Sequence, residues 1–226
     1  MPAVLALDTA TPAVVAALVS LLPQPEVLAA RVAVDARRHG ELLAPAVRDL
    51  LADAGRRPAE LTAVVAGLGP GPFTGLRVGL VTAAVLADAL GIPAYGVCSL
   101  DAVAVPARGR RLLVATDARR REVYWACYDD GGARVAGPEV LRPADLAPRL
   151  GPLGVTAMCG AGARQYADTL RLPLLDADYP DPAALARLAA DRVLAGAPSE
   201  PLTPLYLRRP DAAPPGRAKP VTAGAR

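Results

Sequence analysis

The stretch AVLALDTATPAVVAALVSL, from Ala3 to Leu21, decides the fold class. Two apolar runs flank the turn TATP, which predicts a strand, a tight turn and a second strand. Further along the chain, the patterns predict a third strand at 27–35, a helix at 41–55, a buried strand at 61–69, a helix at 74–90 and a strand at 92–97. Strands that alternate with helices in this way indicate an α/β fold.

A second strand-turn-strand pattern lies at RRLLVATDARRREVYWACYDDGG, residues 110–132. Its first strand ends in Asp117, as the first strand of the chain ends in Asp8, and its second strand alternates Val123, Trp125 and Cys127 with Tyr124, Ala126 and Tyr128. This weak internal repeat predicts two related α/β lobes. We place them at 1–106 and 107–208, with an amphipathic helix at 181–196 in the second lobe and a disordered basic tail at 209–226.

The charge of the chain is concentrated at one end. Five basic residues and one acidic residue follow Leu207, so the segment after Leu207 has a net charge of +4. The whole chain has a net charge of +3, so the body of the chain, up to Leu207, has a net charge of −1. Such a body lacks the broad basic face of strong nucleic-acid binders. The three cysteines, Cys98, Cys127 and Cys159, form no CxxC pair and predict buried, reduced thiols.

Two apolar runs of the chain are candidates for membrane or targeting segments, and neither is predicted to be one. Asp8 interrupts the first apolar run too early for a signal peptide, and no basic residue precedes it. Arg77 and Asp88 interrupt the apolar run after Phe73, so we expect that run not to span a bilayer.

The loop GLGPGPFTGLRVGL, residues 67–80, is glycine-rich but fits neither common phosphate-binding motif. It lacks the GK[ST] step of a P-loop, and its glycines are spaced G-x-G-x-x-x-G. The helix after it is apolar nearly all round, which in a water-soluble chain indicates cover on more than one side. Its stripe of small residues packs either on the parent sheet or against another backbone, and the opposite face then needs a subunit contact. The stripe is Gly75, Gly79, Ala83 and Ala87, and the opposite face holds Leu76, Leu80 and Leu86.

Few residues suit acid-base or metal chemistry. His39 is the one histidine, so a two-histidine metal site is excluded. Asp8 with Thr9 in a strand-to-strand turn has two interpretations, the phosphate loop of an actin-like ATPase or a turn capped by local hydrogen bonds. Asp117 and Arg119 have the same phosphate-binding interpretation, with a salt bridge across the lobes as the structural alternative.

Six segments together resemble the bacterial TsaB family, also called YeaZ. They are LALDTAT, RHGELLAPAVRDLLADAG, GLGPGPFTGLRVGL, GIPAYGVCSLDAVA, ATDARRREVYWACY and PLYLR, and the similarity extends from Ala3 to Arg208. The resemblance implies an actin-like ATPase (ASKHA) fold with two ribonuclease-H-like lobes, whose mixed sheets are flanked by helices.

The resemblance also implies a cytoplasmic, non-catalytic subunit for synthesis of tRNA N6-threonylcarbamoyladenosine. Such a subunit pairs with the catalytic paralogue TsaD, works with the ATPase TsaE, forms a homodimer when alone and contacts tRNA weakly or indirectly. It needs no cofactor or metal of its own, and whether a nucleotide binds at the complex interface stays open. The resemblance places the interface on the first two helices, where we expect Gly79→Arg or Leu80→Glu to abolish TsaD binding with the fold intact. The expected interface residues are His39, Leu42, Leu43, Ala46, Leu50, Phe73, Thr74, Gly75, Leu76, Gly79, Leu80 and Ala83.

A rival hypothesis is a stand-alone ATP-using enzyme of the same fold. Asp8, Thr9, Thr11 and Asp117 would then lie at the phosphates, with Gly160 and Gly162 near the adenosine. In the subunit hypothesis, the same residues with Arg119 are a vestigial nucleotide site. The two hypotheses differ in whether the isolated chain binds ATP tightly.

Overall fold

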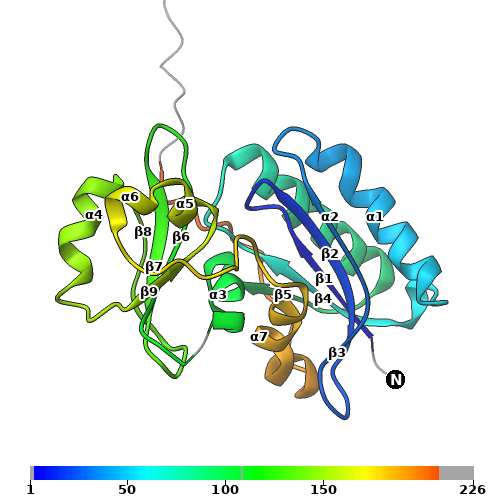
Figure 1. Cartoon of the computed structure of the whole chain (residues 1–226). Helices are drawn as coiled ribbons and strands as arrows, with labels where there is room; N and C mark the ends of the chain where they lie inside the picture. Colours follow the sequence, from blue (N-terminus) through cyan, green and yellow to red (C-terminus); the bar gives the residue numbers. More distant parts are fainter. Residues whose placement is uncertain (1–2, 108, 209–226) are drawn as a thin grey trace, which may run out of the picture.

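The computed structural model describes residues 3–107 and 109–208 and contains two mixed β-sheets, each flanked by helices (Figure 1). The first sheet has the strand order β3-β2-β1-β4-β5 and the second the order β8-β7-β6-β9. The strands of the first sheet are β1 (Ala3–Asp8), β2 (Ala13–Ser20), β3 (Glu26–Val34), β4 (Leu61–Gly67) and β5 (Ala94–Val97). Those of the second are β6 (Leu112–Asp117), β7 (Val123–Tyr128), β8 (Arg134–Leu141) and β9 (Ala157–Cys159).

The two sheets repeat one topology. Strand β1 pairs antiparallel with β2 and parallel with β4, and β6 pairs antiparallel with β7 and parallel with β9. The turns match as well, because Asp8 accepts a hydrogen bond from the N–H of Ala10, and Asp117 accepts one from the N–H of Arg119. The internal repeat predicted from the two strand-turn-strand patterns is therefore present in the structure.

Helices cover both faces of each sheet (Figure 1). On the first sheet, α1 (His39–Asp53) and α2 (Phe73–Leu90) lie on one face and α7 (Pro182–Leu194) on the other. On the second sheet, α3 (Ser99–Ala104) lies on one face, and α4 (Pro143–Leu150), α5 (Ala161–Gln165) and α6 (Ala167–Leu170) lie on the other. Short 3₁₀ turns occupy Pro58–Glu60 and Val105–Ala107.

The two-sided cover explains why the central strands are apolar at every position. Successive side chains of a strand point to opposite faces, so a strand buried on both faces needs no polar alternation. In β1, Leu5 and Leu7 pack under α1 and α2, whereas Val4 and Ala6 pack under α7. The same alternation separates the two faces of β7, as predicted: Val123, Trp125 and Cys127 face the core under α4, and Ala126 and Tyr128 face the core on the α3 side.

Helix α7 corrects the predicted extent of the second lobe. We expected residues 107–208 to form that lobe, but Leu185 and Ala189 of α7 pack with Val4 and Ala6 on the first sheet. Both faces of the second sheet are already covered by α3 and α4–α6, and α7 buries its apolar side where the first sheet is still open. A lobe boundary near residue 106 stays a prediction, and the predicted tail at 209–226 lies outside the described residues.

A C-terminal strap, residues 195–208, returns across both sheets. The N–H of Glu200 donates to the carbonyl of Ala94 in edge strand β5, and the N–H of Leu205 donates to the carbonyl of Leu68, just after β4. At its end, Arg208 donates to the carbonyl of Ala118 at 2.8 Å and forms an ion pair with Glu122, in the turn between β6 and β7. The strap therefore joins the two sheets.

Helix α2 bears on the expectation that the run after Phe73 does not span a bilayer, and that expectation stays a prediction. Its 18 residues, Phe73–Leu90, are long and apolar enough to cross a bilayer by length and composition, and no other helix among residues 3–107 and 109–208 is. A helix in the core of a water-soluble protein passes the same test, and one side of α2 packs on the first sheet. A single helix of this kind is weak evidence for a membrane span.

All three cysteines are buried free thiols, as predicted. Burial raises the pKa of Cys98 to about 11 and the pKa of Cys127 and of Cys159 to about 12. A thiol attacks or oxidises through its thiolate, so these pKa values make all three side chains unreactive at neutral pH.

Candidate partner-binding surface

The small-residue stripe of α2 lies against the β1–β2 turn of its own chain. The hydroxyl of Thr9 donates to the carbonyl of Gly75 at 2.7 Å and accepts from the N–H of Gly79 at 2.9 Å. These two backbone groups are four residues apart, which is the spacing of a helical hydrogen bond. The Thr9 hydroxyl therefore lies between a carbonyl and an N–H group that would otherwise pair with each other in the helix. A Cβ at Gly79 would lie 2.5 Å from the Thr9 hydroxyl oxygen, and one at Gly75 would lie 2.8 Å from the Thr9 carbonyl oxygen. Glycine is needed at both positions for a contact inside the chain.

The structure therefore corrects part of the predicted interface. Gly79 and Leu80 are buried in the core under α2, so we expect Gly79→Arg and Leu80→Glu to disturb the fold rather than to leave it intact. Of the other predicted interface residues, Leu42, Ala46 and Phe73 are half-buried and Thr74 is exposed. The remaining ones, His39, Leu43, Leu50, Gly75, Leu76 and Ala83, are buried within the chain.

The solvent-facing side of α2 carries two exposed valines between the charged residues Arg77 and Asp88. Val81 and Val85, one helical turn apart, are 60% and 61% exposed, and we call this pair the α2 ridge. Isolated exposed valines are common, but two on one helix face form a continuous apolar strip. The face opposite the glycine stripe therefore holds Val81 and Val85, and not Leu76, Leu80 and Leu86 as predicted, because those leucines pack in the core under α2.

A hollow lies on each side of α2. One, of about 430 Å³, lies between α1 and α2 and is lined by Ala44, Val47, Thr82 and Leu86, among others. The other, of about 650 Å³, lies between α2 and the C-terminal strap, and Leu202 lies on its far wall. A ridge between two grooves is the surface that a second helix packs against most closely.

His39 holds the start of α1 to the β1–β2 turn. Its Nε2 lies 2.8 Å from the carbonyl oxygen of Thr11. Because a carbonyl oxygen only accepts, Nε2 carries the proton and donates. The ring is buried and lies 3.4 Å from the place where a Cβ on Gly75 would be, so it packs between the starts of α1 and α2.

A turn pocket of about 400 Å³ lies where the β1–β2 turn, the starts of α1 and α2, and the end of β6 meet. It brings together four of the residues predicted for the nucleotide site, Thr9, Thr11, Asp117 and Arg119, and three predicted for the interface, His39, Thr74 and Gly75. Arg119 lies 3.8 Å from Asp117 in the same turn, and not across the lobes as the structural alternative supposed.

Asp8 does not line the turn pocket. Its carboxylate is fully buried, accepts from the hydroxyl of Ser99 and from the N–H of Ala10 at 2.8 Å, and occupies the space of a missing side chain at Gly67. Burial raises the pKa of Asp8 from 3.8 to about 6, although the two hydrogen bonds lower it again in part. These contacts match the interpretation of Asp8 as a turn residue held by local hydrogen bonds.

Gly160 and Gly162, predicted near an adenosine, pack against the backbone of β6. A Cβ on Gly160 would lie 2.2 Å from the carbonyl oxygen of Ala115, and one on Gly162 would lie 2.7 Å from the carbonyl carbon of Thr116. Neither glycine lines the turn pocket. Among residues 3–107 and 109–208, no group of three or more His, Cys, Asp or Glu side chains is placed to hold a metal ion.

The strap contributes aromatic cover to the start of α2. The rings of Phe73 and Tyr206 lie 4.8 Å apart, and Arg77 donates to the Tyr206 hydroxyl at 2.9 Å with its guanidinium over both rings. Such cation–π and ring contacts stabilise by about 0.5 to 1.5 kcal/mol each. PLYLR was quoted only as part of a resemblance, and nothing in its pattern predicted this packing.

Comparison with known proteins identifies the family. A family model described as "TsaD: tRNA N6-adenosine threonylcarbamoyltransferase" matches residues 26–175. The solved structure of YeaZ from Pseudomonas aeruginosa is 30% identical with a TM-score of 0.74, over 92% of this chain and 100% of that one. The chain belongs to the TsaB/YeaZ family. A second solved structure, of an uncharacterized protein with similarity to peptidase YeaZ from Pseudomonas aeruginosa, is 34% identical to this TsaB/YeaZ chain with a TM-score of 0.77. The predicted actin-like ATPase fold is therefore confirmed.

Relatives of this TsaB/YeaZ chain extend to other bacteria. The tRNA threonylcarbamoyladenosine biosynthesis protein TsaB of Escherichia coli is 39% identical over 42% of the chain and 44% of its own length. Uncharacterized proteins of Mycobacterium leprae and Mycobacterium tuberculosis are 50% and 53% identical over 99% and 93% of the chain. The chain spans 58% of the length of the first and 94% of the second. TsaB/YeaZ homologues take part in tRNA threonylcarbamoyladenosine biosynthesis.

Proposed function

We propose that this chain is a non-catalytic subunit of the bacterial complex that makes N6-threonylcarbamoyladenosine in tRNA, and that it docks on TsaD. The α2 ridge is the observation that carries the proposal. Val81 and Val85 stand exposed between two mainly apolar hollows, each with charged residues in its lining, on a helix whose other side packs on the first sheet. Burying the rest of both valines would contribute about 1 to 3 kcal/mol in total.

The family match supports TsaD as the occupant of this surface. The chain matches a TsaD family model over residues 26–175, a range that includes α1 and α2, so a TsaD partner offers related helices. Two related chains can then meet through equivalent faces, as the subunits of a two-fold dimer do. A second copy of this chain would use the same surface when TsaD is absent.

The hydrogen bonds of His39 and Asp8 are consistent with a non-catalytic role for this chain. His39 donates its Nε2 proton to the Thr11 carbonyl, and Asp8 is held by Ser99 and Ala10, so both groups stabilise the turn. TsaD then supplies the threonylcarbamoyl transfer and most of the tRNA contact, and TsaE the ATPase activity, in the cytoplasm where tRNA is modified. We assign no cofactor to this chain itself.

Val81→Glu combined with Val85→Glu is expected to weaken binding to TsaD about 30-fold, because two charges would have to enter a dry interface. Purified TsaD from the same genome is titrated with the variant by calorimetry, and modified tRNA is measured with TsaE present. Both readouts should fall together.

The matched control is Val32→Glu combined with Val135→Glu. These valines are 51% and 50% exposed, on edge strands β3 and β8 away from α2, and they add the same charge. Unchanged TsaD binding by the α2 variant would refute the docking surface. Full tRNA modification without this chain would refute the subunit role.

ATP with magnesium is expected to show no tight binding to the isolated chain in calorimetry. The Asp8 carboxylate, which the rival enzyme hypothesis needs at the metal-bound water, is buried behind the turn and does not line the turn pocket. Micromolar binding, lost in Arg119→Gln, would instead favour a stand-alone ATP-using enzyme.

A further inference from the structure

The turn between β6 and β7 presents three consecutive arginines in an unusual conformation. Arg119, Arg120 and Arg121 have φ angles of 62°, 53° and 60°, all in the left-handed region that residues other than glycine seldom adopt. The turn is pinned at both ends, because the N–H of Ala118 donates to the carbonyl of Glu122 and the N–H of Glu122 donates to the carbonyl of Arg119. These hydrogen bonds therefore fix the backbone of the turn from which the three side chains project.

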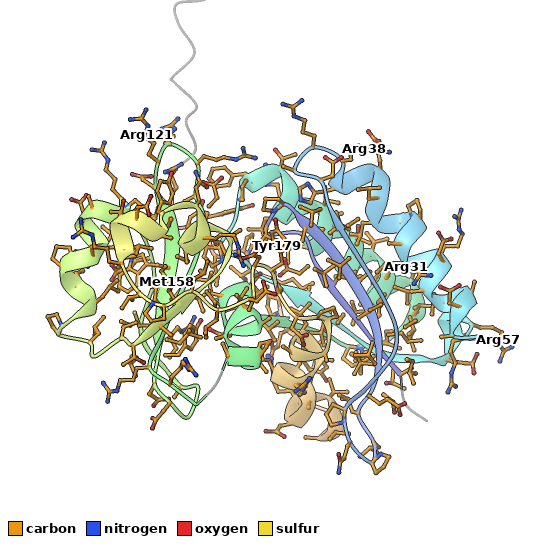
Figure 2. All side chains as sticks on the ribbon, viewed as in Figure 1. Arg31, Arg38, Arg57, Arg121, Met158 and Tyr179 are labelled. Atoms are coloured by element: carbon orange, nitrogen blue, oxygen red, sulfur yellow. The ribbon has the colours of Figure 1, made fainter. Side chains whose placement is uncertain are left out.

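The three arginines separate to two sides of the turn. Arg119 lines the turn pocket beside Asp117, whereas Arg120 and Arg121 line a different cavity of about 390 Å³ next to the start of α4. Figure 2 shows Arg121 at the tip of this turn. The other polar groups on the cavity wall are Arg142, the hydroxyl of Tyr166 and the hydroxyl of Thr169.

This arginine cavity has the charge of an anion site. Its lining combines three guanidinium groups with a tyrosine, and none of its lining residues carries a carboxylate. Within residues 3–107 and 109–208, neither Arg121 nor Arg142 forms an ion pair or a side-chain hydrogen bond, although both are exposed. Arg149 further along α4, by contrast, pairs with Glu139.

We propose that the arginine cavity binds the phosphate groups of an RNA strand. Guanidinium groups pair with phosphate oxygens through two parallel N–H bonds, and the cavity lining includes a half-buried tyrosine, a residue type on which unpaired bases stack. The choice of RNA rests on the proposed function, in which tRNA is the substrate of the complex. The site would add a direct contact between this chain and RNA. The net charge of the body did not predict this contact, because a net charge sums over all residues and hides a local cluster of arginines.

The test is fluorescence anisotropy of a labelled tRNA transcript with the full chain, over about 50 to 200 mM salt. Arg121→Gln combined with Arg142→Gln is expected to bind about tenfold more weakly, and to lower the slope of log K against log salt by roughly 1.5. Arg142→Lys alone keeps the charge and should retain most of the affinity. Arg149→Gln combined with Arg187→Gln removes the same charge from other exposed positions and should bind like the parent chain.

Several results would overturn the inference. These are no tRNA binding by the parent chain, equal losses in the test and control pairs, or AMP or inorganic phosphate competing as well as RNA. TsaD binding, measured on the same variants, is expected to be unchanged. Normal TsaD binding together with unaltered tRNA binding by the variant would reject the RNA site and leave the proposed subunit role standing. TsaD binding by the α2 ridge variant tests the proposed subunit role and does not test the RNA site. Melting curves of each variant confirm that it is folded.

Discussion

Gly79→Arg is expected to destabilise the protein by about 4 kcal/mol or more, which for many domains means unfolding. A Cβ at this position would lie 2.5 Å from the Thr9 hydroxyl oxygen, a distance that real Cβ atoms do not show. The hydroxyl would have to leave both the carbonyl of Gly75 and the N–H of Gly79, and a guanidinium would enter the core under α2. Lost hydrogen bonds, overpacking and a buried charge each cost about 1 to 3 kcal/mol. Urea unfolding at pH 7 measures the loss.

Val81→Arg is the matched control for this prediction. It places the same side chain two residues further along α2, at a position that is 60% exposed, so the free energy of unfolding should change by no more than about 0.5 kcal/mol. The same variant should still weaken TsaD binding, because Val81 belongs to the α2 ridge. If Gly79→Arg has the same midpoint of urea unfolding as the parent chain, the fold does not require the contact between Thr9 and the glycine stripe.

Asp8→Asn is expected to remove a pH dependence of stability worth about 3 kcal/mol. Burial raises the pKa of Asp8 from 3.8 to about 6, so between these values the folded chain holds a proton that the unfolded chain has released. The contribution is therefore fully present below about pH 4 and is lost as the pH rises through about 6. Asparagine cannot ionise and keeps a similar shape. The difference in unfolding free energy between parent and variant should shift by this amount from pH 4 to pH 7.

Urea unfolding at intervals across that range measures the shift. A constant difference between the parent and Asp8→Asn at every pH would show that Asp8 stays ionised in the folded protein.

The central strands could be predicted because their signal is local. Runs such as AVLALD are short, apolar and bounded by turn residues, and a strand covered on both faces has this pattern. The repeat of two strand-turn-strand patterns predicted two related lobes, and the two sheets do repeat one pairing of strands, although their strand orders were not predicted. The predicted start and end of α2 also agreed closely, because Pro72 precedes it and Gly91 ends it with a positive φ of 64°.

The packing partners of the helices could not be predicted, because they depend on contacts distant in sequence. Helix α7 has an ordinary amphipathic pattern that fits either sheet. It packs on the first sheet because other helices already cover both faces of the second sheet. The glycine stripe of α2 fits an approaching backbone from the same chain or from another, and the Thr9 hydroxyl decides this from 70 residues away. The second of these ambiguities led to the expectation that Gly79→Arg would leave the fold intact.

Other elements were missed because breaker residues mask them. Strand β8 contains Gly137 and Pro138, and α4 contains Pro148, which removes the clear period of either structure. The arginine cavity was missed for a different reason. Its members come from the β6–β7 turn, the start of α4 and α6, and no sequence spacing links these three places.

The C-terminal strap limits how the two sheets can move against each other. Its Tyr206 is held on α2 by Phe73 and Arg77, and two residues later Arg208 is held on the β6–β7 turn by Ala118 and Glu122. Opening or closing the molecule as a clamp would stretch this short link until one of these contacts broke. The strap is therefore expected to act as a strut that fixes the angle between the two sheets, so the proposed TsaD-binding surface would keep one orientation relative to the second sheet.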